Sequence, residues 1–182
     1  MMSTAMQPEL DPTCPFCRAD VQAEAFAESQ NFLAVYNISP VLPGHSMVIP
    51  RRHLAGLLQL SDAELCEMSL FARDVVKLLA KAFGQAAFDW TIQDGAAAGQ
   101  TVAHLHLHLI PRKDGDLPQP GDWYPLLEQN ENALLDSAAR ARYDPQAMKL
   151  ISTKLKEIAS AVLPAEPAVR PDLPPAVESK AT

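Results

Sequence analysis

The chain has 182 residues, 48% of them hydrophobic, and a formal net charge of −7 at pH 7. This length suits one domain with its own core, and the acidic balance argues against a nucleic-acid binder or an anionic-membrane binder, both of which need a basic face. No apolar run is long enough for a spanning helix, and residues 1–10 lack the pattern of a secretory signal. With 3 cysteines and no export signal, we expect a cytoplasmic protein without a disulfide framework.

The first half of the chain predicts two strands and one long helix. Residues 1–11 are polar and predict a flexible N-terminus, whereas 32–37 and 45–50 predict strands that neighbour each other, with a Pro- and Gly-containing turn between them. Ser61 and Glu64 form a capping-box pattern, and Gly84 ends the helix. Its predicted buried face carries Leu65, Met68, Ala72, Val75, Leu79 and Phe83. Cys66 lies off that face and is interpreted as an inert thiol.

The centre of the chain predicts the strongest strand. Residues 88–93 predict a strand and 96–100 a tight loop, and a second strand is predicted from 102 to 111. Leucines at 105, 107 and 109 alternate with His104, His106 and His108. Because strand side chains alternate between faces, the leucines are expected to face the core and the three imidazoles to share the other face.

The remainder of the chain predicts a loop, a helix and a tail. Residues 113–124 are rich in Gly, Pro and Asp and predict a long functional or mobile loop. A C-terminal helical extension covers 131–162, with an amphipathic helix from about Pro145 whose apolar stripe contains Met148, Ile151, Leu155, Ile158 and Val162. The five prolines of 163–182 predict a disordered tail.

Three neighbouring imidazoles indicate chemistry, because burying them together is costly unless something uses them. Alternate strand residues stand roughly 6.6 Å apart, so two imidazoles can share a metal, whereas three stretch over about 13 Å. The middle histidine, His106, is therefore better placed as a reacting group with helpers on both sides. A neutral imidazole is a good nucleophile toward phosphorus at pH 7.

The run from Gln93 to Arg112 resembles the signature of the histidine-triad (HIT) family, and Asn37, Pro40 and Pro43-Gly44-His45 resemble its second signature. The resemblance covers 12–130. It implies an α+β fold, with an antiparallel sheet, one long central helix and a C-terminal helix, in a homodimer with joined sheets. Within the family the chain is most similar to the fragile-histidine-triad branch, because the Gly-Gly-Arg and Trp-Pro features of the phosphoramidase branch are absent.

The resemblance implies hydrolysis of dinucleoside polyphosphates of the diadenosine tri- or tetraphosphate kind at the α-phosphate. His106 would form a nucleotidyl-histidine intermediate, which water resolves to a nucleoside monophosphate, while His45 and His108 flank the phosphate and handle protons. The implied substrate-binding residues are polar and flank the triad or open the turn before His45: Gln93, Gln100 and Thr101 at the phosphates and Asn37 at the ribose. Capping of the turn before Pro40 is the alternative role of Asn37. A divalent cation can accompany the polyphosphate.

The pair Cys14-Pro-Phe-Cys17 is by itself consistent with a zinc half-site, a thioredoxin-like pair or chance, although no βαβ pattern of the redox kind follows it. Bacterial HIT proteins that this chain resembles carry the same pair together with Pro-x-x-His, here Pro50-Arg-Arg-His53. That resemblance implies a structural zinc site made by Cys14, Cys17, His53 and His104. The alternative for His53 is a solvent-facing residue beside two arginines.

Three further residues follow the triad. Tyr124 occupies the loop in which this branch carries a tyrosine near the active-site mouth, so it is a candidate contact for the polyphosphate or second nucleotide, with an ordinary surface aromatic as the alternative. Arg112 and Lys113 are expected to contribute modestly to the binding of outer phosphates, with solvated charges at a strand end as the alternative. The rival functions are a nucleoside phosphoramidase or nucleotidyl transferase using the same histidine, and a zinc-stabilised nucleotide-binding module with little catalysis.

Overall fold

The computed structural model describes residues 10–132 and 142–163. Within these ranges one five-stranded sheet has the order β1-β2-β3-β5-β4, and every neighbouring pair is antiparallel. The strands are β1 (Ala27–Glu28), β2 (Phe32–Tyr36), β3 (Ser46–Pro50), β4 (Ala87–Thr91) and β5 (Leu107–Arg112). The α-helices are α1 (Ala19–Ala23), α2 (Asp62–Phe83), α3 (Trp123–Asn132) and α4 (Pro145–Val162). This architecture confirms the predicted α+β class.

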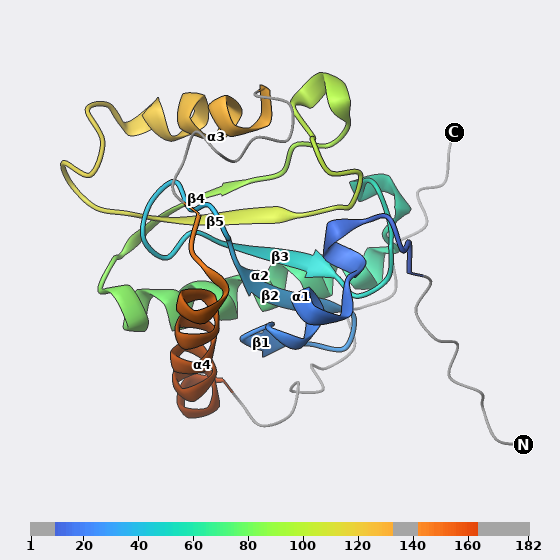
Figure 1. Cartoon of the computed structure of the whole chain (residues 1–182), viewed down its shortest axis with the longest axis horizontal. Helices are drawn as coiled ribbons and strands as arrows, with labels where there is room; N and C mark the ends of the chain where they lie inside the picture. Colours follow the sequence, from blue (N-terminus) through green and yellow to red (C-terminus); the bar gives the residue numbers. More distant parts are fainter. Residues whose placement is uncertain (1–9, 133–141, 164–182) are drawn as a thin grey trace, which may run out of the picture.

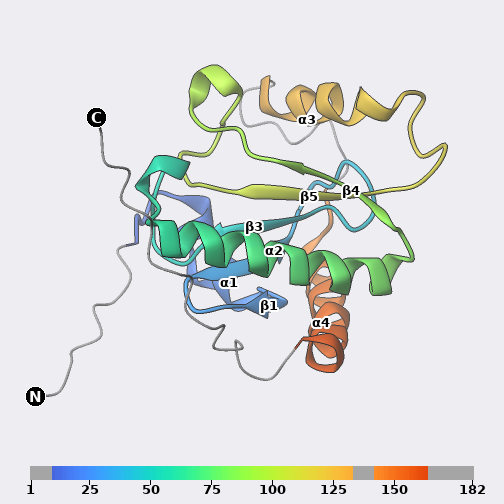
Figure 2. The same cartoon turned by 180° about the vertical axis from the view of Figure 1, so that it is seen from behind.

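The sheet separates two layers of unequal size. Helix α2 lies along one face, and α1 with its preceding turn lies over the other, as the two opposite views show (Figures 1 and 2). The main core fills the space between the sheet, α2 and α4, and it contains the leucines at 105, 107 and 109. A smaller apolar cluster on the opposite face comprises Leu33, Val35, Met47 and Ile49, packed against Phe16, Val21 and Ala25.

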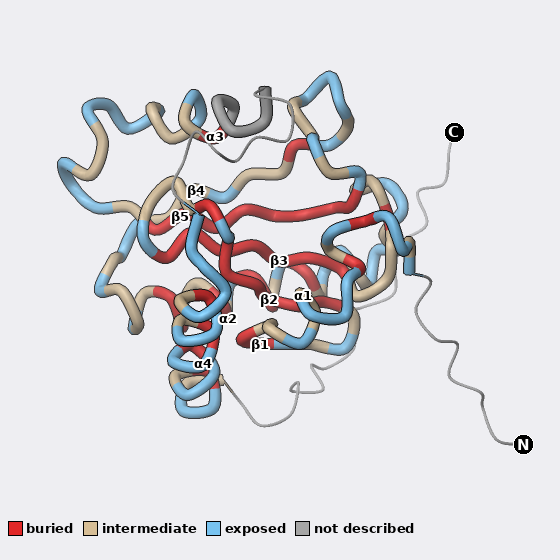
Figure 3. Tube along the Cα trace, viewed as in Figure 1, coloured by how far each residue is buried: buried red, intermediate tan, exposed pale blue. Residues whose placement is uncertain are grey.

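Strands β2 and β3 are antiparallel neighbours, which confirms the prediction for 32–37 and 45–50. Val35 pairs with Met47 across them, and Met47 pairs in turn with His108 on β5. Paired residues point to the same side of a sheet. The side chain of His108 therefore shares the α1 face with the smaller cluster, while the neighbouring leucines enter the main core. The central strands are buried along most of their length (Figure 3).

Helix α2 begins and ends as predicted. The Ser61 hydroxyl accepts a hydrogen bond from the Glu64 N–H, and the Glu64 carboxylate accepts one from the Ser61 N–H. At the other end Gly84 adopts φ 73°, a left-handed conformation that favours glycine. The prediction of Leu65 on the buried face was wrong, because that residue is 40% exposed in the first turns of the helix. The buried face instead includes Phe71 and Leu78.

The predicted strand over 102–111 begins only at Leu107. Two backbone hydrogen bonds explain the difference: the His104 N–H donates to the Val102 carbonyl (2.7 Å), and the Leu105 N–H donates to the Leu54 carbonyl (2.7 Å). The segment before β5 is thus held by a tight turn and by the segment after β3, and it does not join the strand ladder. The alternation of leucines and histidines continues through it, because Leu105 is in the core and His104 is buried on the other side.

The chain after β5 is more ordered than predicted. The segment 113–124 includes a short 3₁₀ turn, Pro120–Asp122, and leads directly into α3, which composition did not indicate. Helix α4 begins at the predicted Pro145, where the Asp144 carboxylate accepts hydrogen bonds from two backbone N–H groups. Residues 1–9 of the predicted flexible N-terminus and 164–182 of the predicted tail lie outside the described residues. Across the part that is described, no helix combines the length and apolarity needed to traverse a membrane.

Candidate active site and metal site

Three buried histidines lie together on the α1 face of the sheet. His108 is on β5, His106 immediately precedes that strand, and His45 immediately precedes β3. His45 Nε2 lies 2.9 Å from His108 Nδ1, and the rings of His106 and His108 have centroids 4.8 Å apart. The antiparallel pairing of β3 with β5 produces this arrangement, because it brings residues 63 positions apart into contact.

Hydrogen bonding determines which nitrogen of His106 carries its proton. His106 Nδ1 lies 2.7 Å from the His104 carbonyl oxygen. A carbonyl can only accept, so Nδ1 is the protonated nitrogen and Nε2 holds the lone pair of the neutral ring. Burial lowers the pKa of His106, which keeps the ring neutral at pH 7. The side chain therefore presents a nucleophilic nitrogen in a fixed orientation.

A second chain of hydrogen bonds orients His45 and His108. The Val41 N–H donates to His45 Nδ1 (3.1 Å), so a neutral His45 carries its proton on Nε2. That N–H donates to His108 Nδ1, and the proton of a neutral His108 is consequently on Nε2. A nucleophilic nitrogen on His106 thus stands next to a hydrogen-bond donor on His108, the combination needed to attack a phosphorus and to stabilise its oxygens.

A separate group of four side chains, Cys14, Cys17, His53 and His104, could hold a metal ion. Their ligand atoms all lie within 4.8 Å of one another. The His104 Nδ1 atom is 3.4 Å from Cys14 Sγ and 3.6 Å from Cys17 Sγ, and His53 Nδ1 is 3.5 Å from Cys17 Sγ. Tetrahedral zinc with ordinary bond lengths would place a sulfur and a nitrogen ligand about 3.6 Å apart. The donor set and its spacing therefore fit a tetrahedral ion.

In His53 and in His104, the ring nitrogen that would not bind the ion lies near another protein group. His104 Nε2 lies 3.1 Å from the Pro50 carbonyl and must donate to it, which leaves Nδ1 as the ligand atom. Burial lowers the pKa of His104 to about 4, so this nitrogen is unprotonated at neutral pH. His53 Nε2 lies 3.8 Å from the Asp11 carboxylate. Burial raises the pKa of the Cys17 thiol, so binding of a cation would have to displace its proton.

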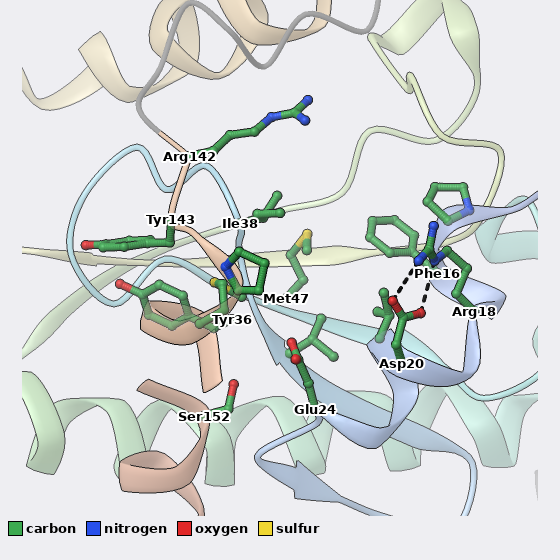
Figure 4. A pocket seen from close by; sticks show the side chains of 15 residues that line it. Phe16, Arg18, Asp20, Glu24, Tyr36, Ile38, Met47, Arg142, Tyr143 and Ser152 are labelled. Carbon is green, nitrogen blue, oxygen red and sulfur yellow. Dashed lines mark hydrogen bonds and ion pairs between the residues drawn. The ribbon is translucent and has the colours of Figure 1, made fainter. Parts of the chain in front are cut away.

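A cavity of about 500 Å³ lies between the α1 segment, the sheet and α4, and its lining residues do not include the histidines themselves (Figure 4). Phe16 connects it to the three histidines, because this residue lines the cavity and the centroid of its ring lies 5.4 Å from that of His106. The apolar wall is formed largely by Phe16, Val21, Val35, Met47 and Met148. The sequence alone does not identify these apolar residues, because only tertiary pairing reveals which of them lie near the triad.

The HIT domain profile matches residues 18–115, more than half of the chain. The chain belongs to the HIT domain family. It is 39% identical over 119 residues to the asymmetrical bis(5′-nucleosyl)-tetraphosphatase of Schizosaccharomyces pombe, a match that covers 65% of each protein. It is 35% identical over 108 residues to the bis(5′-adenosyl)-triphosphatase of Dictyostelium discoideum, covering 59% of this chain and 72% of the relative.

Among solved structures, this HIT protein is similar to a Zn-bound histidine triad family protein from Mycobacterium smegmatis. The TM-score is 0.52 and the identity 31%, and the match covers 69% of this chain and 97% of the other. The aligned part spans less than two thirds of the full length of the S. pombe relative. The two helices α3 and α4 lie beyond the segment that the HIT profile matches.

The predicted substrate-binding residues of the HIT signatures lie in different parts of the structure. Asn37 lies beside the histidines, with Nδ2 3.5 Å from His45 Nε2, and its Oδ1 accepts a hydrogen bond from the Ser39 N–H, as a turn cap would. Gln93 is buried just after β4, and Thr101 is exposed in the loop before His104. Gln100 holds loop backbone together: it accepts from the Gly95 N–H and donates to the Ala55 carbonyl. Their contacts with substrate stay predictions.

The predicted contact residues that follow the triad, Arg112 and Tyr124, do not line this cavity. Tyr124 is on α3 with its ring against Trp123. Arg112 is occupied within the protein: its guanidinium donates to Asp116 through two nitrogens, to Asp89 and to the Pro120 carbonyl. The donors of Arg112 are thus largely taken up by protein groups, and its expected contact with outer phosphates stays a prediction. Its donors hold the segment that leads to α3 against the end of β5.

Proposed function

We propose that this HIT protein hydrolyses dinucleoside polyphosphates at the α-phosphate and releases a nucleoside monophosphate. The observation that carries the proposal is the 2.7 Å hydrogen bond from His106 Nδ1 to the His104 carbonyl, which leaves the lone pair on Nε2 beside His108. The names of the S. pombe and D. discoideum relatives support this choice of substrate class. The cavity beside His106 supports a site for the nucleoside.

The reaction proceeds in two displacements at phosphorus. In the first, His106 Nε2 forms a bond to the α-phosphorus as the bond to the bridging oxygen breaks, and the remaining polyphosphate nucleotide leaves. In the second, water attacks the same phosphorus, the P–N bond breaks and His106 returns to its neutral form. His108, oriented by His45, donates a hydrogen bond to the phosphate oxygens in both steps. The two protons of water end on the monophosphate and the departed polyphosphate.

Replacing His106 by Ala or Asn tests this proposal directly. Turnover of diadenosine tetraphosphate should fall by at least a thousandfold, because a covalent route loses its nucleophile. Binding of AMP should stay within a few-fold of the wild-type value. Mass spectrometry of acid-quenched wild-type protein should show an adenylyl adduct that the variants lack. Full turnover by either variant would refute the assignment, and faster cleavage of an adenosine phosphoramidate by the wild type would favour the phosphoramidase alternative.

We further propose that Cys14, Cys17, His53 and His104 bind a structural zinc ion. The support is the fit of the ligand spacing and the description of the M. smegmatis relative as Zn-bound. Zinc would cross-link the N-terminal turn to the segment before β5, and it would take no part in the phosphoryl chemistry. It would thereby anchor His104, whose carbonyl orients His106.

Metal analysis of protein purified without chelator tests the zinc proposal. We expect about one zinc per chain in the wild type and a large loss in Cys14→Ser, accompanied by a lower melting temperature. Cys66→Ser is the matched control, because Cys66 is exposed on α2 and outside the group. It should retain both metal and stability. Wild-type protein without zinc, or equal metal in both variants, would remove the proposal.

A further inference from the structure

A serine on α4 faces the cavity beside the triad. Ser152 is 3% exposed, and its hydroxyl finds no hydrogen-bond partner among the residues that the structure describes. Figure 4 shows the hydroxyl pointing from α4 into the cavity, which Glu24 and Tyr36 also line. A buried hydroxyl without a partner is unfavourable by itself, so its presence in a cavity wall indicates a group that arrives with a ligand.

The cavity joins Ser152 to the reacting histidine through residues at its other end. Phe16 lines the cavity and packs against His106, and Met47 lines it and is the cross-strand partner of His108. A nucleotide with its α-phosphate at His106 would therefore extend its nucleoside into this space. The size of the cavity, about 500 Å³, is in the range that small-molecule sites occupy.

We infer that Ser152 is a substrate-binding residue that hydrogen-bonds the base of the bound nucleotide. The inference rests on the proposed function. An aromatic base matches both features of the site, because its faces suit the apolar walls while its edge carries hydrogen-bonding atoms. A hydroxyl both donates and accepts, so Ser152 serves adenine and guanine edges alike. A purely apolar ligand would leave the hydroxyl without a partner.

The residue belongs to a part of the chain beyond the matched HIT segment. Residues 18–115 match the HIT profile, whereas Ser152 and the neighbouring cavity residues Tyr143 and Met148 belong to the α4 region. Helix α4 is held firmly there, because Met148 and Leu155 are buried in the main core. The C-terminal extension thus adds a wall with a polar group to the nucleoside site.

Ser152→Ala, with Ser160→Ala as the control, tests this role. Ser160 is on the same helix, is exposed, and its hydroxyl donates to the Glu157 carbonyl. For diadenosine tetraphosphate, kcat/KM of Ser152→Ala should fall roughly three- to tenfold through KM, with kcat unchanged, because the lost bond is present in ground and transition states alike. By calorimetry AMP and GMP should lose similar affinity. Ribose 5-phosphate, which has no base, should bind Ser152→Ala and wild type equally.

The outcomes separate this inference from the proposed function. Unchanged AMP affinity and KM in Ser152→Ala, with an active wild type, would overturn the role of Ser152 alone. A fall in kcat at constant KM, or an equal loss of ribose 5-phosphate, would also overturn it. The melting temperature of Ser152→Ala should not decrease, whereas a merely structural hydroxyl would lower it when removed. A wild type that neither binds AMP nor cleaves the substrate would overturn both proposals.

Discussion

His106 illustrates how one side chain takes its chemistry from a backbone atom. Its proton is placed by the His104 carbonyl, which belongs to a residue that also faces the candidate metal group. The same backbone segment therefore contributes to both candidate sites: the ring of His104 faces the cysteines and its carbonyl faces His106. Loss of the proposed zinc ion should accordingly disturb the orientation of His106 as well as the N-terminal turn.

Arg112 and Asp116 form an enclosed ion pair at the end of β5, with side chains 12% and 7% exposed. The guanidinium beside Asp116 lowers the pKa of that carboxyl to about 2. A depressed carboxyl pKa stabilises the folded state above its ordinary value of 3.8, and this stabilisation is lost as the pH falls toward about 2.

Replacement of this carboxylate should therefore destabilise the protein in a pH-dependent way. We expect Asp116→Asn to lower the free energy of unfolding by about 2 kcal/mol at pH 7, the range of a hydrogen bond to a charged group. The difference from wild type should narrow below pH 4, as measured by urea denaturation at several pH values. Asp114→Asn, an exposed neighbour, is the control. A constant difference down to pH 2 would contradict the ion-pair explanation.

At the scale of elements, the turn between β2 and β3 positions His45 through a glycine. Gly44 has φ 92°, and its N–H donates to the Tyr36 hydroxyl (2.9 Å). A Cβ at this position would lie 2.7 Å from Pro111 Cγ and 3.0 Å from Phe83 Cδ2. Both the backbone conformation and the space thus require glycine. Gly84, in contrast, is left-handed, but a Cβ added there would have nothing within 4 Å among the described residues.

Comparing Gly44 with Gly84 separates the cost of a left-handed backbone from the cost of a steric clash. We expect Gly84→Ala to cost about 1 kcal/mol of stability, from the left-handed conformation alone. Gly44→Ala should cost clearly more, and it should also reduce turnover because His45 follows directly. Chemical denaturation and steady-state kinetics measure the two effects. Equal costs at both positions would show that the contact with Pro111 is relieved without penalty.

At the scale of the whole molecule, the edge of the sheet formed by β4 is a candidate surface for assembly. In the described sheet β4 is a terminal strand, and its Trp90 is 42% exposed. An edge strand offers unpaired backbone groups to another strand. We propose that two copies join their sheets at β4 to form the homodimer that the family resemblance implies.

A positive charge at position 90 should prevent two copies of the chain from pairing at β4. Trp90→Lys should shift the mass measured by light scattering from dimer to monomer, because a lysine on an edge strand opposes strand pairing. Leu58→Lys is a control for exposed apolar residues in general, since Leu58 is 97% exposed on the turn before α2. A dimer that persists in Trp90→Lys, or a wild type that is monomeric, would contradict the proposed interface.

Local sequence patterns were sufficient to predict much of the fold. The capping box at Ser61, the glycine at 84 and the alternation around His106 predicted a helix and a strand close to where they lie. Short elements such as α1 and β1 carried no clear period, and α3 was hidden by a loop-like composition. The start of β5 was misplaced because the hydrogen bond from Leu105 to Leu54 is a tertiary contact, which periodicity does not encode.

The sequence by itself indicated which residues are candidates for the chemistry, because the spacing of the histidines and the cysteine pair are local features of the chain. The family resemblance already implied how they divide, and only the tertiary structure brought the members of each group together in space. It placed His104 among Cys14, Cys17 and His53, and it placed His106 and His108 beside His45. It also directed Arg112 inward to its carboxylates and Ser152 into the cavity. The physical reason is that proton positions, ligand spacing and cavity walls depend on contacts between residues far apart in the chain.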